Sequence, residues 1–373
     1  MDATPTEKIK PLRIFVLTTE QSAEAILKQL LTSIRLFFPD AYIEGVASSE
    51  FQFENFVPFI NSDSLKVMGL IDVLKSLYRI VKIQSQIKKR IQEGNYDLVL
   101  TIDSSSFHIP LVERLKKSGC TARFVHAVCP PIWAYRPGRK PRIAATFDLL
   151  LPLFRFEEKL FQDTPLESFW IGHPFAKHEP VVPKPNETGV ICIFPGSRKR
   201  VIKRNLPLQL AAAKKFSHPI YISISSPQLK GYIESIAPNI PTFEKIPPKE
   251  ILEKTVLALA TSGTITLELA LLSIPTVVTY KLPIIDAIAA KLAKMNVPYF
   301  SLPNLLANEE VFIELIHPLT TVNEVVEAID QTLKTEKKIP LEKIWDQIRA
   351  KYDEKTFVKK LIENTSFALR ELG

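Results

Sequence analysis

Three small or hydroxyl-bearing residues, Ser262, Gly263 and Thr264, separate two apolar stretches in the second half of the chain. The stretch before them, 256–260, is typical of a strand, and the stretch after them carries a single acid, Glu268. Where a helix follows such a turn, its free backbone N–H groups and the positive end of its dipole can bind a diphosphate. Glu268 would then lie about one turn into the helix, within reach of a ribose. Ser and Thr are also common helix N-caps, so ordinary capping in a β-α-β unit is the alternative.

A second turn suited to phosphate follows the apolar run 190–194. There Pro195 and Gly196 precede Ser197 and Arg198, and the residues that follow are strongly basic. Glycine permits close approach of the backbone to a ligand, and a guanidinium group matches the geometry of phosphate oxygens. We therefore predict that Ser197 and Arg198 bind phosphate.

A carboxylate follows an apolar run in the first half of the chain as well. Asp103 comes directly after the run 97–102 and precedes three serines, 104–106. Open parallel α/β sheets bind ligands at the carboxyl ends of their strands, so Asp103 is placed to contact a ligand. A helix N-cap is the alternative for Asp103.

The segment 67–91 combines an apolar stripe with many basic side chains. A basic amphipathic helix can lie on an anionic membrane surface or receive an acyl chain. The alternative is an amphipathic helix that covers a sheet. The apolar positions are Met68, Ile71, Leu74, Leu77, Tyr78 and Val81, and the basic ones are Lys75, Arg79, Lys82, Lys88, Lys89 and Arg90.

A proline-rich basic segment, 130–142, has the composition of a ligand-binding loop. Its prolines disfavour a helix, and guanidinium groups beside aromatic rings suit a phosphate or sugar ligand. A solvated basic loop is the alternative. The aromatic residues are Trp133 and Tyr135, and the basic ones are Arg136, Arg139, Lys140 and Arg142, with Arg123 expected nearby.

Strand-like and helix-like patterns alternate in both halves of the chain, which predicts an α/β protein with largely parallel sheets. At 373 residues, two domains with separate cores are expected. The segment 177–189 is rich in proline and charge, as interdomain linkers are. We predict an N-terminal domain at 1–176, a C-terminal domain at 190–343, and helices at 344–373 that return to the first domain.

The formal net charge of +8 favours anionic partners such as phosphorylated substrates or acidic lipid head groups. No nucleic-acid-binding motif accompanies this charge, so we expect no nucleic acid partner. The three cysteines lack CxxC spacing, which indicates neither a disulfide framework nor a zinc site. The first ten residues lack the pattern of a signal peptide, and no run reaches the roughly 18 apolar residues of a membrane span, so we expect a cytoplasmic protein.

Nine short motifs occur in the order in which they occur in one enzyme family. Through these motifs and their order, the sequence resembles the lipid-A-disaccharide synthases. The motifs are spread over nearly the whole chain. They are VMG (67–69), ID with a hydroxyl-rich turn and Phe (102–107), VHAVCPPIWAYR (125–136), FEEKLF (156–161), WIGHP (170–174), FPGSR (194–198), ATSGTITLE (260–268), PTVVTYK (275–281) and SLPNLLA (301–307).

The resemblance implies an inverting glycosyltransferase of GT-B architecture, in which two Rossmann-like domains face one another across a cleft. Its reaction is the transfer of 2,3-diacylglucosamine from UDP-2,3-diacylglucosamine to the 6'-hydroxyl of 2,3-diacylglucosamine 1-phosphate. The products are the β-1,6-linked lipid A disaccharide 1-phosphate and UDP. The resemblance further implies an enzyme that is peripheral on the anionic inner membrane and uses no metal or other cofactor, and it is compatible with a homodimer.

The same resemblance assigns roles to individual residues. Asp103 matches the family's proposed base, which takes a proton from the acceptor hydroxyl, and His108 is an alternative base. The predicted UDP-sugar site consists of Ser197, Arg198, Ser262, Gly263, Thr264, Glu268 and Asn304, and the predicted acceptor and lipid site consists of Glu20, Ser22, Met68 and Arg136.

Two loops depart from the family pattern and keep other functions open. At 19–24 both glycines of the family's Gly-Glu-x-Ser-Gly-Asp are replaced. In the turn after Asp103, Ser106 stands where the family has a second acid, and His108 stands where it has Asn. One alternative is another UDP-sugar transferase or an enzyme similar to UDP-N-acetylglucosamine 2-epimerase. The other is a catalytically silent homologue that binds UDP-sugar or lipid.

Overall fold

In the computed structural model, the chain folds into two compact units. Unit 1 comprises Met1–Pro174 and Ile348–Gly373, and unit 2 comprises Phe175–Gln347. The structure describes residues 10–20, 23–65, 73–134, 137–177, 189–281, 298–335 and 338–371. The predicted linker, 177–189, therefore lies outside the described residues except at its two ends.

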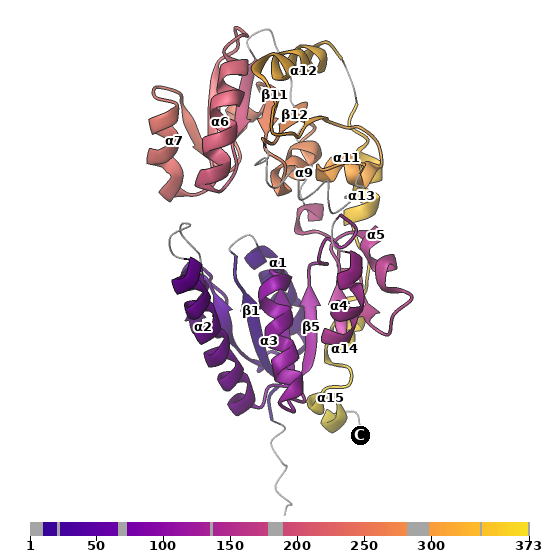
Figure 1. The fold of residues 1–373 in the computed structure, drawn as a ribbon. Coiled ribbons are helices and arrows are strands. Elements are labelled where there is room, and N and C mark those ends of the chain that lie inside the picture. The colour runs from indigo at the N-terminus through magenta and orange to yellow at the C-terminus, as the bar shows by residue number, and fades with distance from the viewer. Residues whose placement is uncertain are drawn as a thin grey trace, which may run out of the picture. The chain divides into compact units, whose positions relative to one another are not determined.

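A seven-stranded parallel sheet forms the centre of unit 1 (Figure 1). Its order, β3-β2-β1-β4-β5-β6-β7, is that of a Rossmann-type sheet extended by one strand. The central strands are buried along their length, as is usual where helices cover both faces of a parallel sheet. The strands are β1 (Arg13–Thr18), β2 (Tyr42–Ala47), β3 (Phe56–Asn61), β4 (Leu98–Ile102), β5 (Arg123–Ala127), β6 (Leu149–Leu151) and β7 (Glu167–Ser168).

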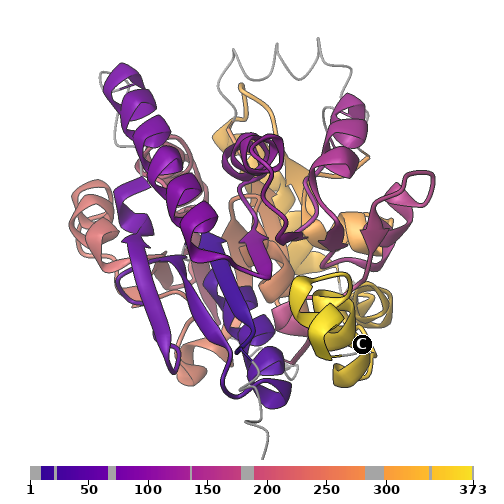
Figure 2. The same ribbon diagram turned by 90° about the horizontal axis from the view of Figure 1, so that it is seen from below.

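Helices lie on both faces of this sheet because successive strand residues point to opposite sides. Ile14 and Val16 pack with the buried face of α1 (Glu24–Phe37). Phe15 and Leu17 face the other side, where α2 (Val73–Gly94) and α3 (Ser105–Lys117) lie (Figure 2). The shorter helices are η2 (Ser62–Leu65), η3 (Pro137–Arg139), α4 (Lys140–Thr146), α5 (Arg155–Glu158) and η4 (Lys159–Phe161). A further short helix, η5 (Pro174–Lys177), leads from unit 1 into unit 2.

One expectation about the segment 130–142 is wrong. Its last three residues begin α4, with Pro141 in the first turn. Proline is tolerated there because the first N–H groups of a helix have no intrahelical acceptor. The prolines therefore do not keep the whole segment out of a helix.

Unit 2 contains a six-stranded parallel sheet in the order β10-β9-β8-β11-β12-β13, which is again the Rossmann order. Ile191 and Ile193 pack with α6 and α12 on one face, whereas Cys192 and Phe194 pack towards α9 on the other. The strands are β8 (Val190–Phe194), β9 (Ile220–Ile224), β10 (Thr242–Glu244), β11 (Thr255–Ala260), β12 (Thr276–Thr279) and β13 (Ile313–Leu315). The helices are α6 (Lys199–Ala213), η6 (Pro227–Leu229), α7 (Lys230–Ile236), α8 (Lys249–Leu252), α9 (Thr264–Leu271), α11 (Leu302–Ala307), α12 (Val322–Lys334) and α13 (Leu341–Ile348).

The end of the chain belongs to unit 1. Helices α14 (Glu354–Ile362) and α15 (Ser366–Glu371) lie with unit 1 (Figures 1 and 2) and pack against its sheet and against α1. Phe357 and Leu361 of α14 are fully buried. The two segments that form unit 1 approach each other closely at Gly172, because a Cβ at this position would lie 2.5 Å from the carbonyl oxygen of Ile348. The His173 N–H donates to the same oxygen over 2.9 Å.

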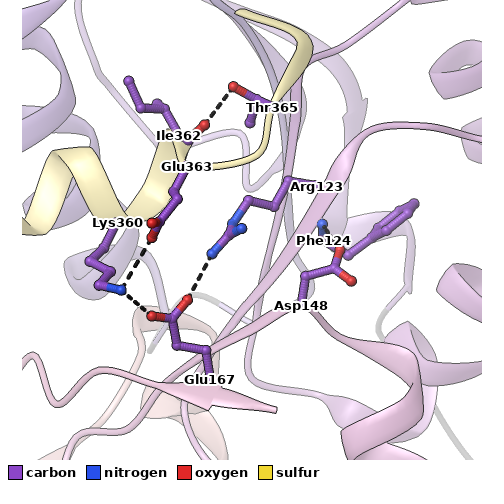
Figure 3. Close-up of polar contacts among 8 residues, drawn as sticks. All are labelled: Arg123, Phe124, Asp148, Glu167, Lys360, Ile362, Glu363 and Thr365. Atoms are coloured by element: carbon purple, nitrogen blue, oxygen red, sulfur yellow. Dashed lines mark hydrogen bonds and ion pairs between the residues drawn. The ribbon is translucent and has the colours of Figure 1, made fainter. Parts of the chain in front are cut away.

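An ion-pair network attaches α14 to the amino-terminal edge of the sheet (Figure 3). Glu167 of β7 accepts hydrogen bonds from Arg123 of β5, over 3.1 Å, and from Lys360 of α14. Lys360 also bonds Glu363, over 3.1 Å. Since Arg123 is only 6% exposed, Glu167 supplies the counter-charge that a buried guanidinium needs.

Candidate active site

The loops that carry Glu20 and Asp103 meet at one edge of unit 1. Strands β1 and β4 are parallel neighbours, and the strand order reverses between them, which is the place where open α/β sheets bind ligands. Thr19, after β1, donates its hydroxyl hydrogen to Oγ of Ser104, after β4, over 2.6 Å. The two predicted loops therefore contact each other directly.

Asp103 has an unusual backbone conformation. Its φ is 55° and that of Ser104 is 40°, so two consecutive non-glycine residues lie in the left-handed region. Such conformations are unfavourable, and they concentrate at functional sites. The N-cap of α3 is Ser104, so the half-buried Asp103 is not the N-cap that the alternative interpretation required.

His108 is not placed to act as a base. Its ring is fully buried, and its Nδ1 lies 2.8 Å from the carbonyl oxygen of Asp103. Burial lowers the pKa of His108 to about 4. His126 is equally buried, its Nδ1 bonds Thr101 over 2.7 Å, and burial holds its pKa well below the usual value. Both histidines are therefore neutral residues of the interior.

Only one predicted acceptor residue can be placed. Glu20 is exposed in the loop after β1, where its carbonyl oxygen accepts the N–H of Ala23 over 3.1 Å. The other three, Ser22, Met68 and Arg136, lie outside the residues that the structure describes, so their roles remain predictions.

The C-terminal part of α2 fits the alternative interpretation of the segment 67–91. Ile83, Ile87 and Ile91 recur at helical spacing and are buried against the sheet. Arg90 is bonded to Glu44 by Nε and Nη2, at 2.6 and 2.8 Å, and so is engaged within the fold. The predicted lipid-facing stripe lies mostly in residues 66–78, whose side chains the structure does not describe.

Several basic residues expected around 130–142 form ion pairs within unit 1. Arg142 binds Glu113 in a bidentate manner, at 2.7 and 2.8 Å, and Lys140 bonds Asp163. Arg123 lies at the start of β5, at the opposite edge of the sheet from this segment. The expectation that Arg123 joins the basic group is therefore wrong.

The two predicted phosphate turns of unit 2 lie against each other. Strands β8 and β11 are neighbours at the point where the strand order reverses, and Thr261 after β11 donates its N–H to the Phe194 carbonyl over 3.0 Å. Gly196 has a φ of 102°, and a Cβ there would lie 3.0 Å from Val201 and 3.1 Å from Oγ1 of Thr261. Only glycine fits this approach without displacement.

Ser197 and Arg198 leave this turn exposed at the start of α6. Gly263 and Thr264 are likewise exposed at the start of α9, where Gly263 is the N-cap. The hydroxyl of Ser262 donates to the Phe300 carbonyl over 3.1 Å and does not cap the helix. Two helix starts with available backbone N–H groups therefore stand at one sheet edge, an arrangement suited to anions.

Glu268 is half-buried in the second turn of α9. Burial raises its pKa to about 7, and the charge of Lys245 partly opposes the increase. A carboxyl group of this kind is ionised over only part of the physiological range, so its hydrogen bonding depends on pH.

Asn304 is a structural residue rather than a ligand contact. It is fully buried, and its Nδ2 donates to the Phe312 carbonyl and to Glu314, each over 2.8 Å. Its Oδ1 accepts the N–H groups of Val311 and Phe312 at 2.9 and 2.8 Å. These four bonds use the full capacity of the amide, which corrects the expectation that Asn304 lines the site.

Sequence reasoning missed two charged residues close to the predicted site elements. Lys245 follows β10 with a φ of 53°, and its positive charge acts to lower the pKa of Glu268. Glu157, in the motif 156–161, is buried, and burial raises its pKa to about 8. It accepts hydrogen bonds from Trp133 Nε1, over 3.3 Å, and from the Phe154 N–H, over 3.2 Å. In the sequence, the only feature that pointed to Glu157 was the pair of acids in the motif FEEKLF (156–161).

Among the described residues, no group of three or more His, Cys, Asp or Glu side chains is arranged to hold a metal ion. Within the same ranges, no helix is both long and apolar enough to cross a membrane. The three cysteines are free, and burial raises the pKa of Cys192 to about 11.

Comparisons with a family model and with curated relatives identify the same family. A family model described as lipid-A-disaccharide synthetase matches residues 14–365. The lipid-A-disaccharide synthase of Acinetobacter baylyi is 32% identical over 354 residues, which cover 87% of this chain and 89% of the relative. That of Chlamydia muridarum is 33% identical over 322 residues, which cover 81% of this chain and 53% of the relative. The chain thus spans about half the length of the chlamydial relatives that it matches.

A more distant structural likeness indicates the fold. UDP-GlcNAc 2-epimerase from Neisseria meningitidis, solved with UDP-GlcNAc bound, gives a TM-score of 0.55 at 11% identity, covering 94% of this chain and 99% of that chain. At this identity the likeness concerns the fold alone. The fold is α/β with two Rossmann-like domains, which is the GT-B architecture that the sequence predicts.

Proposed function

The chain belongs to the lipid-A-disaccharide synthetase family, and from this premise we propose that it transfers 2,3-diacylglucosamine from UDP-2,3-diacylglucosamine to 2,3-diacylglucosamine 1-phosphate. The products are the β-1,6-linked lipid A disaccharide 1-phosphate and UDP. The observation that carries the proposal is the family match over residues 14–365, which includes elements of both units.

In this proposal, unit 2 binds the UDP part of the donor. The starts of α6 and α9 direct backbone N–H groups and positive dipole ends to the diphosphate. Ser197 and Arg198 add a hydroxyl and a guanidinium group, and both are exposed beside Gly196. Glu268 accepts a hydrogen bond from the ribose, and this bond is stronger when the carboxyl group is ionised.

Asp103 acts as the general base in the proposed reaction. The 6'-oxygen of the acceptor attacks C1 of the donor sugar as its proton passes to the Asp103 carboxylate. The bond from C1 to the UDP oxygen breaks, with inversion at C1. Arg198 and the helix starts stabilise the negative charge that develops on UDP. The half-buried position of Asp103 at the reversal of strand order supports this role.

Unit 1 binds the acceptor and its acyl chains in this proposal, with Glu20, Ser22, Met68 and Arg136 contributing. A recess of about 760 Å³ beside β2 and β3 is lined by aromatic side chains, which suit an acyl chain, and by polar side chains, which suit a sugar. Its aromatic lining residues are Phe51, Phe53, Phe56 and Phe59, and Lys28 contributes a cation.

We extend the proposal to the membrane and to assembly. The net charge of +8 and the basic segment that begins α2 support peripheral binding to an anionic bilayer surface. Co-sedimentation with vesicles of zwitterionic lipid, with and without anionic lipid, tests this binding. Light scattering of the purified protein tests whether it is a homodimer.

The deciding experiment is incubation of the purified protein with UDP-2,3-diacylglucosamine and 2,3-diacylglucosamine 1-phosphate. We expect disaccharide 1-phosphate and UDP in equal amounts. A different product from the UDP-sugar would favour another transferase or an epimerase. Binding of UDP-sugar without any product would favour a silent homologue.

A further inference from the structure

His108 forms a hydrogen bond whose direction can be deduced. Its Nδ1 lies 2.8 Å from the backbone carbonyl oxygen of Asp103. A carbonyl oxygen can only accept, so Nδ1 must carry the hydrogen. Because burial lowers the pKa of His108 to about 4, the ring is neutral at physiological pH, and its Nε2 carries no hydrogen.

The rest of the ring gains no polar contact. Nε2 of His108 is buried and has no hydrogen-bond partner among the described residues, and the same holds for Nε2 of the neighbouring His126, whose ring centroid is 6.0 Å away. A buried polar atom without a partner is unfavourable, and an apolar side chain would avoid that cost. In the part of the chain that the structure describes, the hydrogen bond from Nδ1 to the Asp103 carbonyl is therefore the one polar contact of the His108 ring.

This bond acts on the strained turn itself. Asp103 and Ser104 have left-handed φ values of 55° and 40°. The Asp103 N–H is bonded to Ala127 over 2.9 Å, and the Ser104 hydroxyl is bonded to Thr19 over 2.6 Å. The bond from His108 holds the carbonyl of Asp103, and so orients the peptide plane between the two residues.

We propose that His108 is a positioning residue for Asp103, which it holds through the backbone so that the carboxylate keeps its orientation toward the acceptor hydroxyl. The inference rests on the proposed function for the role of Asp103. An Asn amide donates from the same distance along the side chain, so asparagine at this position would provide an equivalent hydrogen bond.

Three variants test the role of His108 in turnover. His108→Leu removes the donor and retains bulk, and we expect kcat to fall about 10- to 100-fold with KM for either substrate changed less than about twofold. His108→Asn restores a donor and should keep kcat within about threefold of the wild type. Leu111→Val, also buried in α3, is the packing control and should lower the melting temperature with kcat unchanged. Unchanged kcat in His108→Leu, or equal losses in the Leu and Asn variants, would overturn the inference.

Two further measurements do not depend on turnover. Nitrogen-15 NMR of the imidazole should show hydrogen on Nδ1 and a bare Nε2. Hydrogen exchange at the Phe107 and His108 amides, which donate to the Ser104 carbonyl over 2.8 and 3.2 Å, should accelerate in His108→Leu and not in His108→Asn. A ring protonated on Nε2 instead would contradict the inference whatever the activity. The wild type could make no disaccharide and still show the expected tautomer and the expected amide exchange. The proposed function would then fail, whereas the inference that His108 holds the turn at Asp103 would stand.

Discussion

The two units place their candidate residues at equivalent points of equivalent sheets, yet they hold them in different ways. In unit 1, side chains brace the turn after β4: Thr19 bonds Ser104, and His108 bonds the carbonyl of Asp103. In unit 2, the turn after β8 is shaped by the close approach of Gly196, and Arg198 projects from it exposed.

This difference suits the two proposed tasks. A general base works only when its oxygen lies within hydrogen-bond reach of the proton, so its orientation must be fixed before the substrate binds. A diphosphate is recognised by charge and by backbone N–H groups, and exposed cationic side chains can adjust to it. Substitutions in unit 1 should therefore lower turnover, and substitutions in unit 2 should weaken donor binding.

The largest expected effect is that of Asp103→Asn. Asparagine tolerates the left-handed conformation, so the variant removes the base and retains the turn. We expect turnover to fall about 10²- to 10⁴-fold, with UDP affinity by calorimetry within about twofold of the wild type. Asp103→Ala should also abolish turnover, with added backbone strain. A normal rate in Asp103→Asn would remove this residue as the base and end the contrast between the units.

Arg198→Ala should weaken UDP binding about 10- to 100-fold, because a charge-assisted hydrogen bond to phosphate is lost. Arg198→Lys should recover part of the affinity. Arg204→Ala, an exposed cation one to two turns further along α6, is the matched control for net charge. Equal losses in the two alanine variants would mean that only the general basic field matters.

Gly196→Ala should weaken UDP binding by about tenfold and lower the melting temperature. Its φ of 102° is strained for alanine, and the new Cβ would crowd Val201 and Thr261. Gly231→Ala, in α7, is the control, since a Cβ there meets nothing within 4 Å and alanine favours a helix. Normal affinity in Gly196→Ala would show that the turn does not hold the diphosphate.

The smallest effect is the pH dependence of UDP binding through Glu268. Its folded-state pKa of about 7 lies above the ordinary value of 4.5, so protonation favours the folded protein. Its contribution to stability is complete below pH 4.5 and is lost as the pH rises through 7. The ionised carboxylate is the stronger acceptor for the ribose hydroxyl, so the Kd should increase, by up to about tenfold, from pH 8 to pH 6.

Glu268→Gln separates this effect from titration of the ligand. The variant experiences the same change in phosphate charge but has no carboxyl group to titrate, so its Kd should vary less with pH than that of the wild type. Parallel pH profiles in the two proteins would contradict a contact between Glu268 and the ribose. Calorimetry at several pH values provides the measurement.

Features that depend on local pattern could be predicted from the sequence. The runs at 97–102 and 190–194 are strands because they are apolar, β-branched and followed by turn residues. The alternation of such runs with helical periods leads to parallel sheets, and the order of the motifs leads to the GT-B fold. The short strand β13, with the sequence IEL, carries too little pattern to be recognised.

Features that depend on tertiary hydrogen bonding could not be predicted. Nothing local distinguishes an Asn that contacts ligand from Asn304, whose amide is saturated by Glu314 and the backbone of 311–312. The distance of Arg123 from the basic segment follows from its place at the start of β5. The burial of His108 likewise depends on how α3 packs on the sheet, which sequence spacing does not specify.

The return of the chain to unit 1 has a consequence for biosynthesis. Because α14 and α15 complete the interior of the first unit, that unit cannot finish folding until the ribosome has made the whole of unit 2 and these two helices. Ending translation after Pro174 would leave apolar surface on α1 without its cover. Since the His173 N–H bonds the carbonyl of Ile348, a short splice between these points would give a minimal gene for the first unit without the intervening 173 codons of Phe175–Gln347.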